Sequence, residues 1–159
     1  VVLSPDGRWL IYPGPDYALR VVDLKSGKPH GSLTGLTWHV SALACSADSR
    51  RVAAGSQDGS LMVWDIVSGK PEIGPFPAHS AAVNHVEYSS DGKTLLTTPF
   101  AGGLRMWNAA NGRSMISIPE AESTACPLLA EGDQALVFWN LKTGDLERHP
   151  APPLRSFDR

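Results

Sequence analysis

The chain has 159 residues, of which 42% are hydrophobic and 19% are charged, and its formal net charge is −2 at pH 7. These values are typical of one folded domain, and they argue against a broad nucleic-acid interface or a polybasic membrane anchor, which both need excess basic charge. No apolar run approaches the roughly 18 residues that a membrane-spanning helix needs.

One sequence motif, which we call the phrase, occurs four times along the chain, and its copies match one another to different degrees. Its clearest copy is Val63-Trp64-Asp65 followed by a turn that closes at Gly69. The steps between the closing glycines are 42, 43 and 32 residues, counted from Gly27, Gly69, Gly112 and Gly144. A period of about 40–45 residues is typical of a propeller blade.

A second landmark repeats in phase with the first. A Ser-x-Asp turn begins at Ser4, Ser46 and Ser89, again at steps of 42 and 43 residues. Because the two motifs keep the same spacing from each other in the three copies that have both, the repeat is not explained by chance.

The second copy shows what one repeat contains. Alternating or short apolar runs predict strands over 40–45, 51–55, 60–65 and 72–76, and polar turns separate these strands. Asp58-Gly59 is a favoured hairpin turn, because tight hairpins need positive φ. We therefore predict an all-β fold, a β-propeller of four-stranded antiparallel blades.

The predicted propeller segment covers residues 1–149 and contains about 3.7 repeats. Its blades span approximately 1–35, 36–78, 79–119 and 120–149, and residues 150–159 form a Pro-rich tail or the start of a further blade. The last blade is shorter by about ten residues, and we expect the loss between Ser117 and Gly132. The acidic residues of that stretch form either a solvated loop or a partner-binding insertion: Glu120, Glu122 and Glu131.

With these residues in view, the chain resembles the WD-repeat family over nearly its whole length. The sequence of residues 74–79, which precede a predicted strand, is similar to sequences in bacterial multi-blade WD-repeat proteins. The resemblance implies a β-propeller that serves as a platform for other proteins. Because ordinary WD-repeat rings have more blades, we expect a fragment of a longer propeller. The alternatives are an open arc closed by a second copy or by a partner.

The resemblance also implies a hydrogen-bonded set of His, Ser or Thr, Asp and Trp that ties each blade together. No copy has the complete set: Leu36 replaces the His, Ala101 replaces one Asp, and Val22 replaces one Trp. Either Thr97 or Thr98 fills the hydroxyl position of the third copy. The residues assigned to structural repeat positions are Asp16, Ser56, Asp58, Trp64, Asp65, His79, Trp107, Asp133 and Trp139.

The sequence predicts no catalytic or metal chemistry. The five histidines and two cysteines show no HxxxH or CxxC spacing, and no phosphate-binding glycine loop or nucleophile elbow is present. Cys45 is interpreted as a small hydrophobe in a strand, with a reactive thiol as the alternative. We therefore expect no cofactor and no enzyme activity, and the cellular compartment is left open.

Binding of a partner is a better prediction than catalysis, and we expect it at the loops that enter the blades. Trp38 is either an exposed interface anchor or a residue that packs between blades. The candidate partner contacts are Thr37, Trp38, His39, Gln57, Ser80, Ala82 and Phe100.

The leading hypothesis is a non-catalytic protein–protein interaction scaffold. Its expected partners are other proteins or the remaining blades of a longer propeller, with self-association through open sheet edges also possible, and neither nucleic acid nor membrane. The alternatives are a propeller enzyme or small-molecule sensor that uses the central channel, and a docking or sensor domain of a bacterial signalling protein.

Overall fold

A computed structural model describes residues 1–101, 103–118, 124–130, 135–140 and 145–150. These residues form four antiparallel sheets. The first sheet contains β1 (Val2–Leu3), β2 (Trp9–Pro13), β3 (Leu19–Asp23) and β4 (Lys28–Leu33). The second contains β5 (Val40–Cys45), β6 (Arg51–Ser56), β7 (Ser60–Asp65) and β8 (Pro71–Pro77). The third contains β9 (Val83–Tyr88), β10 (Thr94–Pro99), β11 (Leu104–Asn108) and β12 (Ser114–Ile118), and the fourth β13 (Thr124–Ala130), β14 (Ala135–Asn140) and β15 (Leu146–Pro150).

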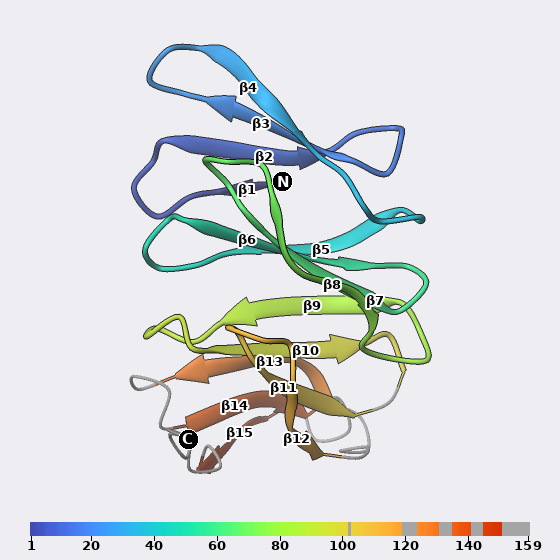
Figure 1. Cartoon of the computed structure of the whole chain (residues 1–159). Coiled ribbons are helices and arrows are strands. Elements are labelled where there is room, and N and C mark those ends of the chain that lie inside the picture. Colours follow the sequence, from blue (N-terminus) through green and yellow to red (C-terminus); the bar gives the residue numbers. More distant parts are fainter. Residues whose placement is uncertain (102, 119–123, 131–134, 141–144, 151–159) are drawn as a thin grey trace.

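The sheets are stacked face against face, with the first sheet at one end of the stack and the fourth at the other (Figure 1). In each of the first three sheets, consecutive strands pair in chain order, so each sheet is one up-and-down meander. This is the architecture of propeller blades, and it confirms the predicted all-β partial propeller.

The fourth sheet differs from the other three in the number of its described strands. It has three, and β14, whose sequence aligns with β11, is the middle one. Between β12 and β14, in the stretch where we expect the loss, the structure describes one strand, β13. That strand lies against β9 of the third sheet, and the Leu129 N–H donates to a Glu87 carboxylate oxygen at 3.1 Å.

The repeated Ser-x-Asp landmark is a self-capping turn between the first two strands of a sheet. The Ser hydroxyl donates to the Asp carboxylate at 2.6, 2.5 and 2.7 Å in the three copies, which begin at Ser4, Ser46 and Ser89. The same hydroxyl accepts the N–H five residues later, at 2.8 to 2.9 Å. These local bonds account for the Ser and the Asp that recur in the three turns.

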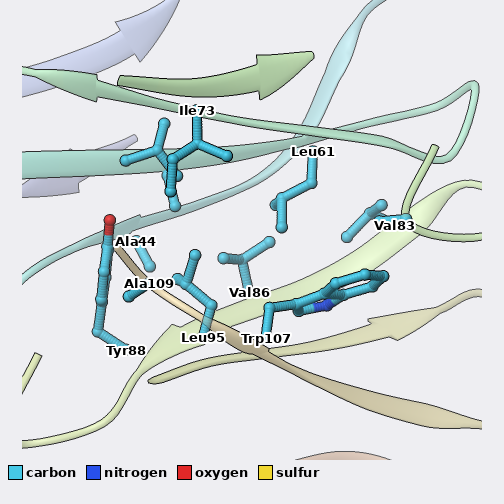
Figure 2. Packing of buried hydrophobic residues seen from close by; sticks show 12 residues of the cluster. Ala44, Leu61, Ile73, Val83, Val86, Tyr88, Leu95, Trp107 and Ala109 are labelled. Atoms are coloured by element: carbon cyan, nitrogen blue, oxygen red, sulfur yellow. The ribbon is translucent and has the colours of Figure 1, made fainter. Parts of the chain in front are cut away.

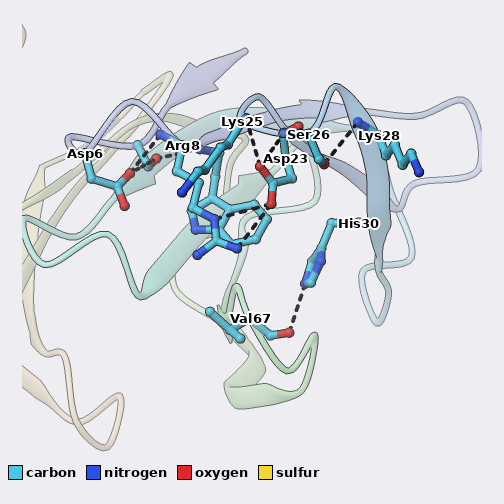
Figure 3. Close-up of polar contacts among 10 residues, drawn as sticks. Asp6, Arg8, Asp23, Lys25, Ser26, Lys28, His30 and Val67 are labelled. Atoms are coloured by element: carbon cyan, nitrogen blue, oxygen red, sulfur yellow. Dashed lines mark hydrogen bonds and ion pairs between the residues drawn. The ribbon is translucent and has the colours of Figure 1, made fainter.

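The closing glycines belong to a second capped turn. Asp23 accepts the N–H groups of Lys25 and Ser26 at 2.9 and 3.2 Å and also binds the Arg8 guanidinium at 3.1 Å (Figure 3). Gly27 then closes the turn with φ of 69°, a conformation that favours glycine. Gly69 and Gly112 have φ of 69° and 70°, so the spacing of the phrase follows from turn geometry.

Each sheet covers the face that the next sheet turns toward it. In the second sheet, the buried residues of that face are Val52, Ala54, Met62, Trp64 and Ile66, and Leu43 and Cys45 beside them are partly buried. In the third sheet the equivalent residues Tyr88, Leu95, Trp107 and Ala109 pack against Ala44, Leu61, Val63 and Ile73 of the second (Figure 2). The Phe76 and Trp107 rings meet nearly edge to face across this junction, with centroids 5.1 Å apart.

Trp64 gives a direct test of this packing. Its side chain is 1% exposed, and its indole N–H donates to the Thr34 carbonyl at 2.9 Å. We predict that Trp64→Ala lowers the free energy of unfolding by about 3–5 kcal/mol in urea titrations, because it leaves a cavity between two sheets. Trp38→Ala, at a tryptophan that is 55% exposed, should change it by less than about 1 kcal/mol. A loss below about 1 kcal/mol for Trp64→Ala would show that the blade register is misplaced.

Candidate interaction face

Five connections gather along one side of the stack, on the right of Figure 1; some join neighbouring sheets, and the others join the second and third strands of one sheet. They are the β2–β3, β4–β5, β6–β7, β8–β9 and β10–β11 connections, and we call this surface the loop face. All seven predicted partner contacts belong to these connections. Six of them are exposed and Ala82 is half-buried; the exposed six are Thr37, Trp38, His39, Gln57, Ser80 and Phe100.

Equivalent hydrogen bonds hold the loops of the second and third sheets in place. The Gln57 N–H donates to the His39 carbonyl at 2.9 Å, and the Phe100 N–H donates to the Ala82 carbonyl at 2.8 Å. The second pair follows the first by 43 residues at both positions. The repeat therefore sets Phe100 where the second sheet has Gln57, and only the side chain differs.

Three aromatic side chains give the loop face its chemical character. Trp38 is 55% exposed and Phe100 is 82% exposed, so neither is used to pack one sheet on another. Tyr17 is 38% exposed, and its ring meets His39 nearly edge-on at 4.8 Å between centroids. The loop face thus presents aromatic groups on three successive sheets.

Tyr17 is a residue that the sequence reasoning missed. It occupies the turn position of Gly59 in the next repeat and has a left-handed backbone with φ of 62°. Non-glycine residues rarely adopt this conformation, and among the described residues Ser49 is the other non-glycine that does. The available signal was the pair Asp16-Tyr17 standing where the second copy has Asp58-Gly59.

A polar relay supports the loop face in the third sheet. Trp107 donates its indole N–H to Thr97 Oγ1 at 2.8 Å, and Thr97 Oγ1 lies 2.7 Å from His79 Nε2. The indole N–H can only donate, so the threonine hydroxyl accepts it, and the same hydroxyl is the hydrogen-bond partner of the imidazole. Burial, with the nearby Arg105 guanidinium, lowers the pKa of His79 to about 4, and the ring is therefore neutral at pH 7.

In the second sheet, the repeat tryptophan, serine and aspartate each form separate hydrogen bonds in place of a relay. Leu36 stands in place of the histidine and is buried, and Trp64 bonds instead to the Thr34 carbonyl. Ser56 Oγ donates to the His39 carbonyl at 3.2 Å, while Asp58 accepts the Ser60 N–H at 2.9 Å. Each polar group has a partner, although the indole is not tied to a histidine-centred set.

Two further repeat acids act in turns. Asp16 forms a bidentate ion pair with Arg20, with both oxygens 2.8 Å from one guanidinium nitrogen, and this contact lowers the pKa of the Asp16 carboxyl. Asp65 accepts the Ser68 N–H at 2.7 Å.

The remaining predictions concern chemistry or residues outside the described part of the chain. Among the residues that the structure describes, no three His, Cys, Asp or Glu side chains gather as a metal site would require. Burial raises the pKa of the Cys45 thiol to about 11, which disfavours the reactive thiolate. Asp133, the Trp139 side chain and the acidic residues 120, 122 and 131 lie outside the described residues, as do residues 151–159.

No helix in the described part of the chain is long and apolar enough to cross a membrane.

Known proteins are similar to this chain in sequence. Protein groucho of Drosophila melanogaster is 32% identical over 117 residues, which cover 72% of this chain and 16% of groucho. The LST8 homolog of the same organism is 30% identical over 161 residues, covering 90% of this chain and 50% of that protein. The chain therefore spans half or less of the length of these two relatives.

Solved structures agree on the fold. The structure of U3-55K matches with a TM-score of 0.73 at 18% identity, over 94% of this chain and 50% of that one. The computationally designed Ika4 protein matches with a TM-score of 0.75 at 17% identity, over 91% of this chain and 86% of that one.

Repeat, fold and relatives together define the class, which is a β-propeller built from WD-type blades. Within this class, the sequence pattern of the family described as Nucleolar protein 10-like, N-terminal domain, matches residues 16–154. The chain belongs to this WD-repeat β-propeller family.

Thr97 and its neighbour Thr98 offer a matched test of the relay. Thr97→Val removes the partner of two buried ring nitrogens, so we expect it to lower the free energy of unfolding by about 1–3 kcal/mol. Thr98→Val, a half-buried position on the same strand, should change it by less than about 0.5 kcal/mol. Equal effects of both substitutions in chemical denaturation would show that the relay contributes nothing beyond strand packing.

Proposed function

We propose that the chain is part of a non-catalytic protein-interaction scaffold and that its loop face receives a protein partner. The observation that supports this most directly is the exposure of Trp38 and Phe100 on loops of neighbouring sheets. Large aromatic side chains are the commonest anchors of protein interfaces, because each buries much apolar surface on binding.

The loops that carry these anchors are held before any partner arrives. The His39–Gln57 and Ala82–Phe100 backbone bonds fix the two loop pairs, and the sheets beneath them are buried. A surface fixed in advance loses less conformational entropy on binding, so more of the contact energy contributes to affinity.

The charges beside the loop face favour protein over nucleic acid. Among the described residues next to this face, Arg20 is engaged by Asp16, and Arg105 donates to the Ala78 carbonyl at 2.7 Å. A nucleic-acid surface needs several cations directed at phosphates, and the whole chain has a net charge of −2. We therefore propose partners that are proteins, and neither nucleic acid nor a membrane surface.

Other hypotheses from the sequence stay predictions. They are a propeller enzyme, a small-molecule sensor that uses the central channel, and a docking domain of a bacterial signalling protein. The bacterial sub-type in particular draws no support from the relatives named above, which come from Drosophila melanogaster.

Affinity capture with matched variants tests the scaffold proposal. The tagged chain and its Trp38→Ser/Phe100→Ser double variant are used as baits at physiological salt, with retained proteins quantified by mass spectrometry. The control is Val67→Ser, at a side chain that is 57% exposed on the β7–β8 turn, on the opposite side of the stack from the loop face. We predict at least about tenfold lower recovery of specific partners with the double variant, because interface anchors each contribute above about 1 kcal/mol.

Two results would contradict the proposal. One is equal recovery with all three baits. The other is that no protein is retained, while a small-molecule library raises the melting temperature by several degrees.

A further inference from the structure

Charged residues are divided unequally between the two sides of the stack. In the first three sheets, each connection on the side opposite the loop face contains one basic residue (Figure 1): Arg8, Lys25, Arg50, Lys70, Lys93 and Arg113. Three aspartates share these connections, namely Asp6, Asp48 and Asp91. The five connections of the loop face contain two aspartates, Asp16 and Asp58, and neither Lys nor Arg. The loop face is therefore the acidic side of these three sheets.

Of its two aspartates, Asp58 is the one whose charge is available to a partner. Asp16 is already paired with Arg20. The Asp58 carboxylate is exposed and accepts the Ser60 N–H of its own turn at 2.9 Å, and no Lys or Arg of the described residues forms an ion pair with it. Partial burial raises the pKa of Asp58, but hydrogen bonds from Ser60 and Ser56 outweigh this effect and lower the pKa, so the carboxylate is ionised at pH 7.

Aromatic side chains lie beside this carboxylate. The Gln57 N–H donates to the His39 carbonyl at 2.9 Å, so Asp58 and Trp38 are each one residue away from a bonded pair. The Tyr17 ring meets the His39 ring at 4.8 Å between centroids, and both Tyr17 and Trp38 are exposed. The face of an aromatic ring attracts a cation, as does a carboxylate. This part of the loop face therefore has the chemistry that binds a positively charged side chain.

We propose that the protein partner of the loop face presents a Lys or Arg side chain, which pairs with Asp58 and lies against the neighbouring aromatic rings. This inference rests on the scaffold function proposed above and adds the charge of the contacting segment. The third sheet has no equivalent acid, because Phe100-Ala101 stand where the second sheet has Gln57-Asp58. The basic residue of the segment consequently lies over the second sheet, and an apolar residue covers Phe100 over the third.

Charge complementarity favours such a segment over an acidic one. When a partner covers the loop face, water is removed from Asp58, and a carboxylate that is left without a counter-charge in an interface is destabilising. A basic side chain offsets this cost, whereas Asp or Glu at the same place adds repulsion. The connections of the loop face contain no Lys or Arg that could neutralise Asp58 instead.

A random peptide library displayed on phage tests the proposal, with the tagged chain as bait at physiological salt. Phages that also bind the Trp38→Ser/Phe100→Ser variant are removed first, so the remaining peptides depend on the loop face. We expect Lys or Arg to be enriched at least about threefold at one position of the selected peptides, next to apolar residues.

A double-mutant cycle then locates the basic residue on Asp58. Fluorescence anisotropy measures the affinity of a selected peptide, and of the same peptide with its basic residue replaced by Gln, for the wild-type chain and for Asp58→Asn. Each single change should weaken binding at least about threefold, and the two together should weaken it no more than either alone, because both remove one contact. Asp48→Asn is the matched control, since it removes the same charge from an exposed position of the same sheet on the opposite side of the stack, and it should leave the affinity unchanged.

Three results would overturn the inference: selected peptides without enriched Lys or Arg, independent effects of the two changes, or an equal loss with Asp48→Asn. A bait that selects no peptide would overturn it as well. Circular dichroism and the melting temperature of both Asn variants establish that they fold. None of these outcomes decides the scaffold function, which the affinity capture tests through Trp38 and Phe100 without reference to Asp58.

Discussion

A narrow four-stranded sheet cannot bury both of its faces, and the structure of this chain depends on how that constraint is met. Each sheet covers one face of its successor, and the repeat tryptophan stands on the covered face. Trp64 meets the first sheet and Trp107 meets the second, where it lies against Phe76. The recurring phrase therefore marks the position at which each sheet packs on the preceding one. The acid or amide after the tryptophan serves the turn that follows it.

Packing also explains why the polar set varies so freely. The third sheet keeps a histidine–threonine–tryptophan relay, while the second replaces the histidine with a buried leucine and sends its indole N–H to a backbone carbonyl. Both solutions leave the indole satisfied, and both retain the apolar contact. With the sheets fixed in this way, the loops are free to differ, and Gln57 and Phe100 occupy one backbone position with different chemistry. Variation at the loop face is thus compatible with a constant fold.

Much of the fold follows from local patterns, while the site depends on contacts between repeats. The strands β5 and β7 have the bounds that alternation predicts, and the turns follow from Ser-x-Asp and glycine chemistry. The carbonyl partner of Trp64 was not predictable, because backbone groups of a neighbouring repeat carry no sequence signal. Asp16 occupies the repeat position of the aspartate, yet it forms an ion pair with Arg20, four residues later. Exposure of Trp38 stayed open at the sequence level, since a tryptophan before a strand suits either packing or binding.

The central claim is that the repeat tryptophan acts by packing on the preceding sheet, and a double-mutant cycle between Phe76 and Trp107 tests it most directly. The cycle compares Phe76→Leu, Trp107→Phe and the double variant by chemical denaturation. Their rings lie 5.1 Å apart across the junction of two sheets, so we predict a coupling free energy of about 0.5–1.5 kcal/mol. A coupling within about 0.3 kcal/mol of zero would show that the two sheets are stabilised independently and would contradict this account.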